Sequence, residues 1–166
     1  EIWLGLVGSE MCIRDSRGRV LRQALVQRGY QEIVSYSFSE PSLLESLHSN
    51  TDQAIDQTID LDNPISDQLS RMRDTLWAGL IPAWKHNMQR QAERIRLFEV
   101  ASVFTRAQNA EIDESKRLSG LVWGDVQPEQ WGEGKRIADF HDVKADIEAL
   151  FRQSGLLTGI RFEKAE

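Results

Sequence analysis

The sequence has little cysteine, no long apolar run and no excess of basic charge. Cys12 is the single cysteine among 166 residues, which excludes an internal disulfide framework and a multi-cysteine zinc site and makes a reducing cytoplasm the simplest expected compartment. The longest uncharged apolar run, around residues 76–84, is far shorter than the roughly 18 residues that a membrane span needs, so no membrane partner is expected. The formal net charge of -6 disfavours a free-standing nucleic-acid-binding domain.

Charge is distributed unevenly along the chain. Residues 40–67 hold seven acidic residues and neither Lys nor Arg, whereas residues 84–106 hold five basic residues against two acidic ones, a local charge of +3. Two interpretations stay open: two solvated faces of opposite sign, or a basic stretch that meets a phosphate backbone or an acidic partner surface. The candidate nucleic-acid contacts in the second interpretation are Lys85, Arg90, Arg94 and Arg96.

The apolar pattern predicts a mixture of helices and strands. Helices are expected over residues 19–28, 42–47, 74–91 and 139–154. Strands are expected over residues 33–38, 55–61, 95–104, 118–123 and 160–162. The run 95–104 is nearly continuous in apolar and small residues, which is typical of an inner strand covered on both faces. Because the elements show no regular βαβ rhythm, the pattern favours an α+β domain on a mostly antiparallel sheet.

Individual residues mark the expected ends of these helices. Gly29 is expected to stop the first helix, and Asp74 and Asp139 are expected to cap the third and fourth. Pro82 removes a backbone hydrogen bond inside the third helix and predicts a kink there or a break just before it. In the fourth helix, Phe140 is expected to share one apolar face with later residues.

The residues by themselves show no catalytic constellation. The Gly-Glu-Gly-Lys at 132–135 lacks the glycine and the Ser or Thr that a phosphate-binding loop requires. The acidic residues near 60–63 resemble a calcium loop, but Ile65 stands where that loop needs glycine. The aspartates around His141 are explained by helix capping, and Cys12 has no motif around it. We therefore expect no catalytic, cofactor-binding or metal-binding residue in this chain.

Four blocks of sequence nevertheless form a familiar combination. They are Arg-Gly-Tyr-Gln-Glu-Ile-Val-Ser-Tyr-Ser-Phe at 28–38, Asn-Pro-Ile-Ser with Met-Arg and Leu-Trp-Ala-Gly-Leu within 63–80, Arg-Leu-Phe-Glu-Val to Phe at 96–104, and Glu-Gln-Trp with Asp-Phe-His-Asp-Val-Lys-Ala-Asp-Ile-Glu within 129–148. In this order they resemble the central core of the bacterial phenylalanine–tRNA ligase beta subunit. The first 16 residues do not, so we expect a foreign or misjoined segment at 1–16 and an incomplete core domain at 17–166.

The resemblance implies a class II aminoacyl-tRNA synthetase-like core, a mostly antiparallel sheet flanked by helices, truncated at its C-terminus. The holoenzyme it implies is a cytoplasmic α2β2 heterotetramer that joins phenylalanine to its tRNA using ATP and magnesium, neither of which this piece is expected to bind. In active class II enzymes the corresponding strand leads into Phe-Arg-x-Glu, whose Arg grips the ATP phosphate. Here Phe104 is followed by Thr105, Arg106 and Ala107, so the expected Arg is replaced by Thr and no Glu follows. The missing charges also disfavour an independent ATP-using ligase.

The expected role is therefore a non-catalytic scaffold that packs on the alpha subunit. The turn at 63–65 and an aromatic helix face suit such a contact, because rigid turns and large aromatic side chains favour buried interfaces. Plain intradomain core is the open alternative for the same residues, and a tRNA contact through 85–96 is the alternative function. The interface candidates are Asn63, Pro64, Ile65, Arg73, Leu76, Leu80 and Trp84.

Overall fold

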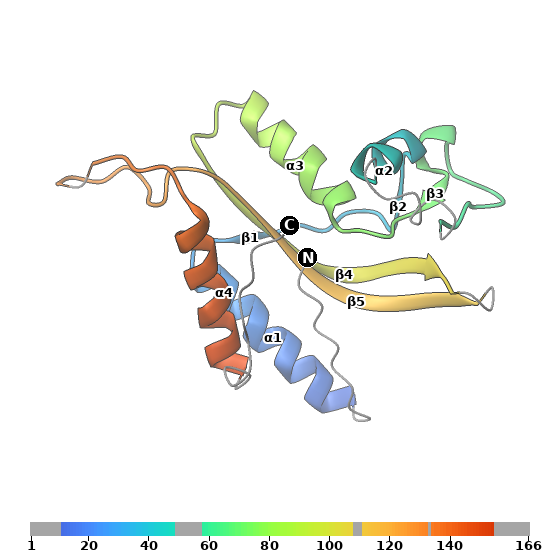
Figure 1. The fold of residues 1–166 in the computed structure, drawn as a ribbon, viewed down its shortest axis with the longest axis horizontal. Helices are drawn as coiled ribbons and strands as arrows, with labels where there is room; N and C mark the ends of the chain where they lie inside the picture. The colour runs from blue at the N-terminus through green and yellow to red at the C-terminus, as the bar shows by residue number, and fades with distance from the viewer. Residues whose placement is uncertain (1–10, 49–57, 108–110, 133, 155–166) are drawn as a thin grey trace. The chain divides into compact units, whose positions relative to one another are not determined.

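The computed structural model describes residues 11–48, 58–107, 111–132 and 134–154. Within these ranges the chain divides into two compact units, one holding residues 32–92 and 97–121 and the other 11–31, 93–96 and 122–154. The elements, drawn in Figure 1, are α1 (Met11–Gln27), β1 (Gln31–Glu32), β2 (Phe38–Ser39), α2 (Pro41–Leu47), the 3-10 turn η2 (Asp67–Leu69), β3 (Arg71–Met72), α3 (Trp77–Gln89), β4 (Arg94–Arg106), β5 (Ile112–Gly124) and α4 (Phe140–Ser154).

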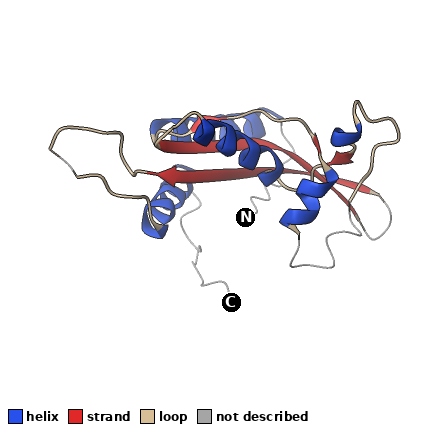
Figure 2. Cartoon of the chain, turned by 90° about the horizontal axis from the view of Figure 1, so that it is seen from above, coloured by secondary structure: helices blue, strands red, loops and turns tan. Residues whose placement is uncertain are grey.

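The sheet is built around β4. Its strand order is β1-β4-β5, and β2 and β3 form a separate antiparallel pair. The short segment 107–111 joins β4 to β5, which permits only antiparallel pairing because a parallel pair needs a long crossover. Figure 2 shows these as the two long strands. Residues 95–99 of β4 are all buried, so the inner strand and the α+β class predicted from the sequence are confirmed.

The first unit has its core between α3 and the central part of β4. Leu44 of α2, Leu76 and Leu80 at α3, and Phe98 and Val103 of β4 have no exposed surface. α2 opens with a proline at its first position, where the missing N–H leaves no hydrogen bond unmade. α3 continues through Pro82 to Gln89, so the helix does not break before the proline.

Two local predictions in the first unit are wrong. The strand expected at 33–38 is instead the short β1 and β2 with an irregular segment between them, whose Ser35 hydrogen-bonds a side chain rather than a strand backbone. Asp74 does not cap α3, because the helix begins two residues later than a cap at Asp74 requires and the Asp74 carboxylate is buried against His48. The predicted strand at 55–61 lies partly outside the described residues, and so does all of 160–162.

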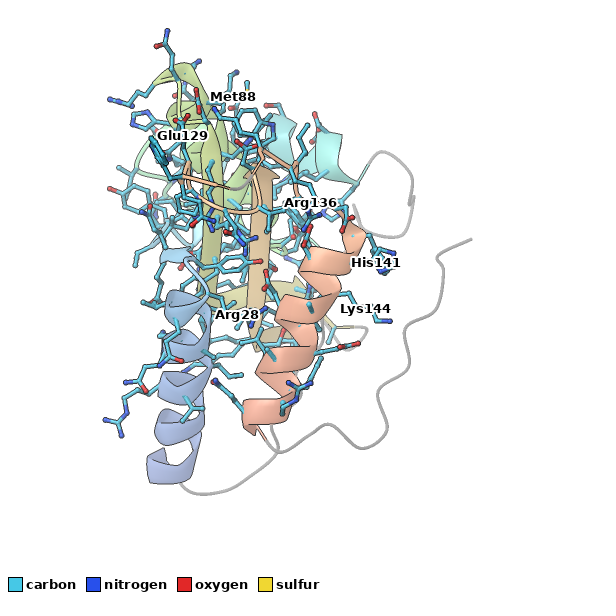
Figure 3. The ribbon with its side chains drawn as sticks, turned by 90° about the vertical axis from the view of Figure 1, so that its left-hand side faces the viewer. Arg28, Met88, Glu129, Arg136, His141 and Lys144 are labelled. Atoms are coloured by element: carbon cyan, nitrogen blue, oxygen red, sulfur yellow. The ribbon has the colours of Figure 1, made fainter. Side chains whose placement is uncertain are left out.

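The second unit pairs α1 with α4, which lie side by side in Figures 1 and 3. The end of α1 confirms the predicted glycine stop. Gly29 has φ 81°, the Gly29 N–H donates to the Val26 carbonyl at 2.9 Å, and the Tyr30 N–H donates to the Leu25 carbonyl at 3.0 Å. This reciprocal pair of bonds satisfies carbonyls that the helix end would leave free. α1 begins at Met11, inside the segment 1–16 discussed above.

α4 begins with the predicted aspartate cap. Asp139 Oδ1 accepts the N–H groups of His141 and Asp142 at 2.8 and 3.1 Å, and Asp142 Oδ2 accepts the Asp139 N–H at 2.9 Å. Phe140 is 66% exposed, so its predicted place on the buried face is wrong; the side chain stands at the first helical position, outside the packed face. None of the described helices is long and apolar enough to cross a bilayer.

Candidate functional site

A buried ion pair joins β4 to the segment before α3 in the first unit. The Arg73 guanidinium lies 2.9 Å from Glu99 Oε1, and the two side chains are 3% and 2% exposed. Ser35 Oγ donates to the Glu99 carboxylate at 2.9 Å and accepts from Arg73 at 2.8 Å, while Arg73 Nε donates to the Ser102 carbonyl at 3.0 Å. Two segments that are distant from β4 in the sequence are thus tied to one carboxylate of that strand.

Gly79 of α3 makes room for this network. A Cβ at residue 79 would lie 2.1 Å from Ser35 Oγ and 2.9 Å from Glu99 Oε2, far inside normal contact distance. The close approach of α3 therefore depends on a residue without a side chain at this position. Arg73 and Glu99 are consequently covered by α3 and do not face an open cleft.

A second buried carboxylate organises the second unit. Asp146 of α4 accepts hydrogen bonds from Arg28 Nε at 2.5 Å, from the Tyr30 hydroxyl at 2.7 Å and from Arg96 at 2.9 Å. The Arg96 guanidinium also lies 5.3 Å from the centroid of the Tyr30 ring, a cation–π distance. Figure 3 shows Arg28 at the end of α1, next to α4. These contacts join the end of α1 and the start of β4 to α4.

This cluster makes the stability of the second unit depend on pH. Burial raises the pKa of the Tyr30 phenol well above its ordinary value, and the hydrogen bond to Asp146 raises it further. The unfolded chain loses this proton near pH 10.0, whereas the folded chain keeps it. The contribution to stability is therefore complete below that pH and falls as the pH rises above it.

We expect Tyr30→Phe to remove this decline. Urea denaturation between about pH 8.5 and 11.5 should show the free energy of unfolding of the wild type falling by up to ~1.4 kcal/mol per pH unit from this phenol, and a shallower slope in the variant. The variant also loses one hydrogen bond, which lowers stability at every pH but leaves the slope unaffected. Equal slopes in the two proteins would contradict the assignment.

The candidate nucleic-acid contacts are divided between the two units. Lys85 and Arg90 are exposed in the first unit, where Arg90 contacts His86. In the second unit Arg94 is half-buried, and burial together with the nearby Arg96 lowers the pKa of its guanidinium. Arg96 is 8% exposed and paired with Asp146, so its charge is directed into the protein. The buried position of Arg96 is unsuited to a phosphate contact.

The interface candidates also separate by burial. Arg73, Leu76 and Leu80 are 3%, 0% and 0% exposed within this chain, which fits the alternative of plain intradomain core. Trp84 is half-buried, and its Nε1 is buried without a hydrogen-bond partner among the described residues. The remaining candidates form the turn at 63–65, whose last side chain, Ile65, is 80% exposed.

The strand that would carry the ATP-binding Arg of active class II enzymes ends without that residue. Thr105 is half-buried and Arg106 is exposed at the end of β4. Because adjacent residues of a strand point to opposite faces, Arg106 does not replace an Arg at 105. In the described part of the chain, no three His, Cys, Asp or Glu side chains gather as a metal ion would require.

The two buried carboxylate clusters were not identified from the sequence. A signal for one was present, since Glu99 is a charged residue in the middle of an apolar inner strand and such a residue is rarely buried without a partner. The identity of that partner, Arg73, could not be derived from spacing along the chain. The same holds for Asp146, which lies 50 residues from Arg96.

The sequence is similar to one family over nearly its whole length. Residues 10–166 match the family described as phenylalanyl tRNA synthetase beta chain CLM domain. A phenylalanine–tRNA ligase beta subunit from Thiobacillus denitrificans is 46% identical over 133 residues, 80% of this chain and 16% of that protein. The one from Pseudomonas putida is 41% identical over 142 residues, 86% of this chain and 17% of that protein.

Solved structures support the same fold. A Desulfitobacterium hafniense pyrrolysyl-tRNA synthetase superposes with a TM-score of 0.64 at 15% identity, over 86% of this chain and 47% of that one. An ATP phosphoribosyltransferase regulatory subunit/histidyl-tRNA synthetase from Bacillus halodurans superposes with a TM-score of 0.64 at 16% identity, over 93% and 38%. The predicted class II synthetase-like fold is confirmed. The chain, which spans 16–17% of the length of the two curated relatives above, belongs to the phenylalanyl-tRNA synthetase beta chain CLM domain family.

Proposed function

We propose that this chain is part of the beta subunit of a phenylalanine–tRNA ligase and acts there as a non-catalytic scaffold that packs on the alpha subunit. The complete enzyme is a cytoplasmic α2β2 heterotetramer that uses ATP and magnesium to join phenylalanine to tRNA(Phe), with the chemistry on the alpha subunit. The relatives named above carry this enzyme's name and are about six times longer than the matched segment, which supports the first part of the proposal.

One observation carries the scaffold role: the end of β4 offers Thr105 where an active class II enzyme presents the Arg that grips ATP. The charged side chains buried beside this strand do not replace it, because Arg73 is paired with Glu99 within the chain. A guanidinium held in that way compensates a buried carboxylate and has no free face for a phosphate. The geometry therefore suits a support better than a site of phosphoryl chemistry.

The turn at 63–65 is the proposed contact with the alpha subunit in the first unit. Ile65 exposes 80% of its surface, and Asn63 beside it is exposed as well. A large apolar side chain at a turn with a proline is displayed at little conformational cost, because proline already restricts the backbone.

Size-exclusion chromatography of the full-length beta chain mixed with the alpha chain tests the proposal. We expect the two to co-elute, and Ile65→Asp to weaken their association about 10-fold, as burial of an unpaired carboxylate does at an interface. Ile112→Asp is the matched control, since Ile112 is 64% exposed in the same unit and is not part of the turn. Failure of the folded wild-type chains to co-elute would refute the scaffold role.

A contact with tRNA through 85–96 remains the second candidate, now with fewer residues. Lys85 and Arg90 keep exposed charges, whereas Arg96 is paired with Asp146. Two exposed cations provide a weak, strongly salt-dependent contact, because each phosphate contact contributes separately to counterion release. The scaffold role is therefore the better supported of the two.

A further inference from the structure

A loop between β5 and α4 in the second unit has an ordered base. We call residues 126–136 the Trp131 loop; it is the long loop before α4 in Figures 1 and 2. Asp125 and Ile137 form an antiparallel bridge, the Val126 N–H donates to the Arg136 carbonyl at 2.9 Å, and the Ala138 N–H donates to the Gly124 carbonyl at 3.0 Å. Backbone hydrogen bonds thus join the two arms of the loop at its base.

Side-chain ion pairs hold the returning arm as well. The Arg136 guanidinium forms a bidentate pair with the Asp142 carboxylate of α4, at 2.8 and 2.6 Å. Figure 3 shows Arg136 next to the first turn of this helix. Lys135 Nζ lies 3.2 Å from Glu93 Oε2, just before β4. A bidentate pair fixes orientation as well as distance, so it orients the base of the loop relative to the first turn of α4.

The tip of this anchored loop displays a tryptophan. Trp131 is 104% exposed, and Gly132 follows it at φ 91°, a conformation that favours glycine. The loop borders a concavity of about 500 Å³, lined by Pro128, Glu129 and the two glycines that follow the tryptophan, Gly132 and Gly134. An apolar side chain of this size gains nothing from full exposure to water, whereas tryptophan is among the residues that dominate the energy of protein interfaces.

The charge around the loop selects among partners. Glu93, Asp125 and Glu129 all act on Lys135, raising the pKa of its ammonium group. Three carboxylates against two cations, the Lys135 ammonium and the Arg94 guanidinium that donates to the Val126 carbonyl, leave this side of the loop net negative by one charge. Arg136 is already neutralised by Asp142. A phosphate backbone would be repelled here. The complementary surface is an apolar socket for the indole, bordered by Lys or Arg side chains.

We propose that the Trp131 loop is a docking element that inserts the Trp131 indole into an apolar, basic-rimmed socket on the alpha subunit. This inference rests on the proposed function, because the alpha subunit is the partner named there. It adds a contact in the second unit that is separate from the turn at 63–65. The anchored base keeps the cost of ordering the loop on binding low, since its arms are already fixed.

Oxidation footprinting of the full-length proteins tests the occupant. Hydroxyl radicals with peptide-level mass spectrometry should modify Trp131 at least 10-fold faster in the beta chain alone than in the complex with the alpha chain. Equal oxidation in both samples would overturn the proposal while the complex itself, seen by chromatography, upholds the scaffold role. Protection of Trp131 already in the isolated beta chain would also overturn it, because the socket would then belong to the same polypeptide.

Variants at the tip supply an affinity measurement. We expect Trp131→Ala to raise the dissociation constant of the alpha–beta complex at least 10-fold, and Trp131→Phe to raise it less. Glu129→Lys should weaken association several-fold at low salt, with the difference disappearing near 1 M salt. Val26→Ala is the control, since Val26 is 56% exposed on α1 in the same unit and lies outside the loop; it should leave the constant within 2-fold. An unchanged constant for Trp131→Ala would refute the docking element.

Discussion

Replacing Arg73 with methionine is expected to lower the free energy of unfolding by about 4 kcal/mol. Methionine keeps the length and the aliphatic part of the side chain but leaves the Glu99 carboxylate, which is 2% exposed, without its cation. Ser35 can still donate to that carboxylate, but one neutral hydroxyl does not offset the desolvation of a full charge. Urea denaturation followed by tryptophan fluorescence measures the loss, since Trp77 and Trp84 lie in the same unit.

A double variant separates the charge from the packing. Arg73→Met combined with Glu99→Leu removes both charges, and most of the lost stability should return, because buried ion pairs are often replaceable by apolar side chains of similar volume. Lys144→Met is a control at a partly exposed i,i+4 pair, where less than about 1 kcal/mol is expected. A loss below 1 kcal/mol for Arg73→Met would mean that the pair is not buried as described.

Gly124→Ala is expected to destabilise the second unit by about 3 kcal/mol. Gly124 ends β5 at φ 85°, where any L side chain is strained. A Cβ at this position would also lie 1.9 Å from the Glu93 carbonyl oxygen and 3.2 Å from the Arg94 Cα, and both are backbone atoms that cannot rotate away. The start of β4 would have to move, and with it Arg94, whose Nε donates to the Val126 carbonyl at 3.3 Å.

Gly134→Ala is the matched control for this prediction. No heavy atom outside its own chain neighbours lies within 4 Å of the position that an alanine Cβ would take, so the added methyl group meets open space. Its effect on the free energy of unfolding, measured by urea denaturation, should stay within about 0.5 kcal/mol. Equal midpoints for the two alanine variants would show that β5 does not approach the start of β4 as closely as described.

The residue pattern alone predicted those features whose cause is local. Gly29 ends α1 because its left-handed conformation lets the following N–H groups donate to the last carbonyls of the helix. Asp139 caps α4 because its carboxylate accepts hydrogen bonds from the first N–H groups of that helix. The continuous apolar run of β4 marked it as the inner strand. The family followed from blocks of sequence that occur in a fixed order. Apart from the order of these blocks, each of the signals lies within a few neighbouring residues.

The pattern failed where distant segments decide the outcome. The segment 33–38 has the composition of a strand, and the Ile33 N–H does donate to the Phe98 carbonyl of β4 at 2.8 Å. The strand does not continue, because Ser35 hydrogen-bonds the Glu99 carboxylate instead. Asp74 lies where a helix cap is expected, but its carboxylate hydrogen-bonds His48 at the end of α2. In each case a polar group hydrogen-bonds a residue far away in the sequence and not a local backbone group. The spacing of residues along the chain does not identify that distant partner.

The sequence by itself determined the fold class and the family, because both depend on residue identity in order. Only the tertiary structure decided which candidate residues are available to a partner. It buries Leu76, Leu80 and Arg96 within the chain and leaves Ile65 and Trp131 in solvent. Burial is a property of what packs over a residue, and the neighbours that cover Arg96 come from α1 and α4, far from it in sequence.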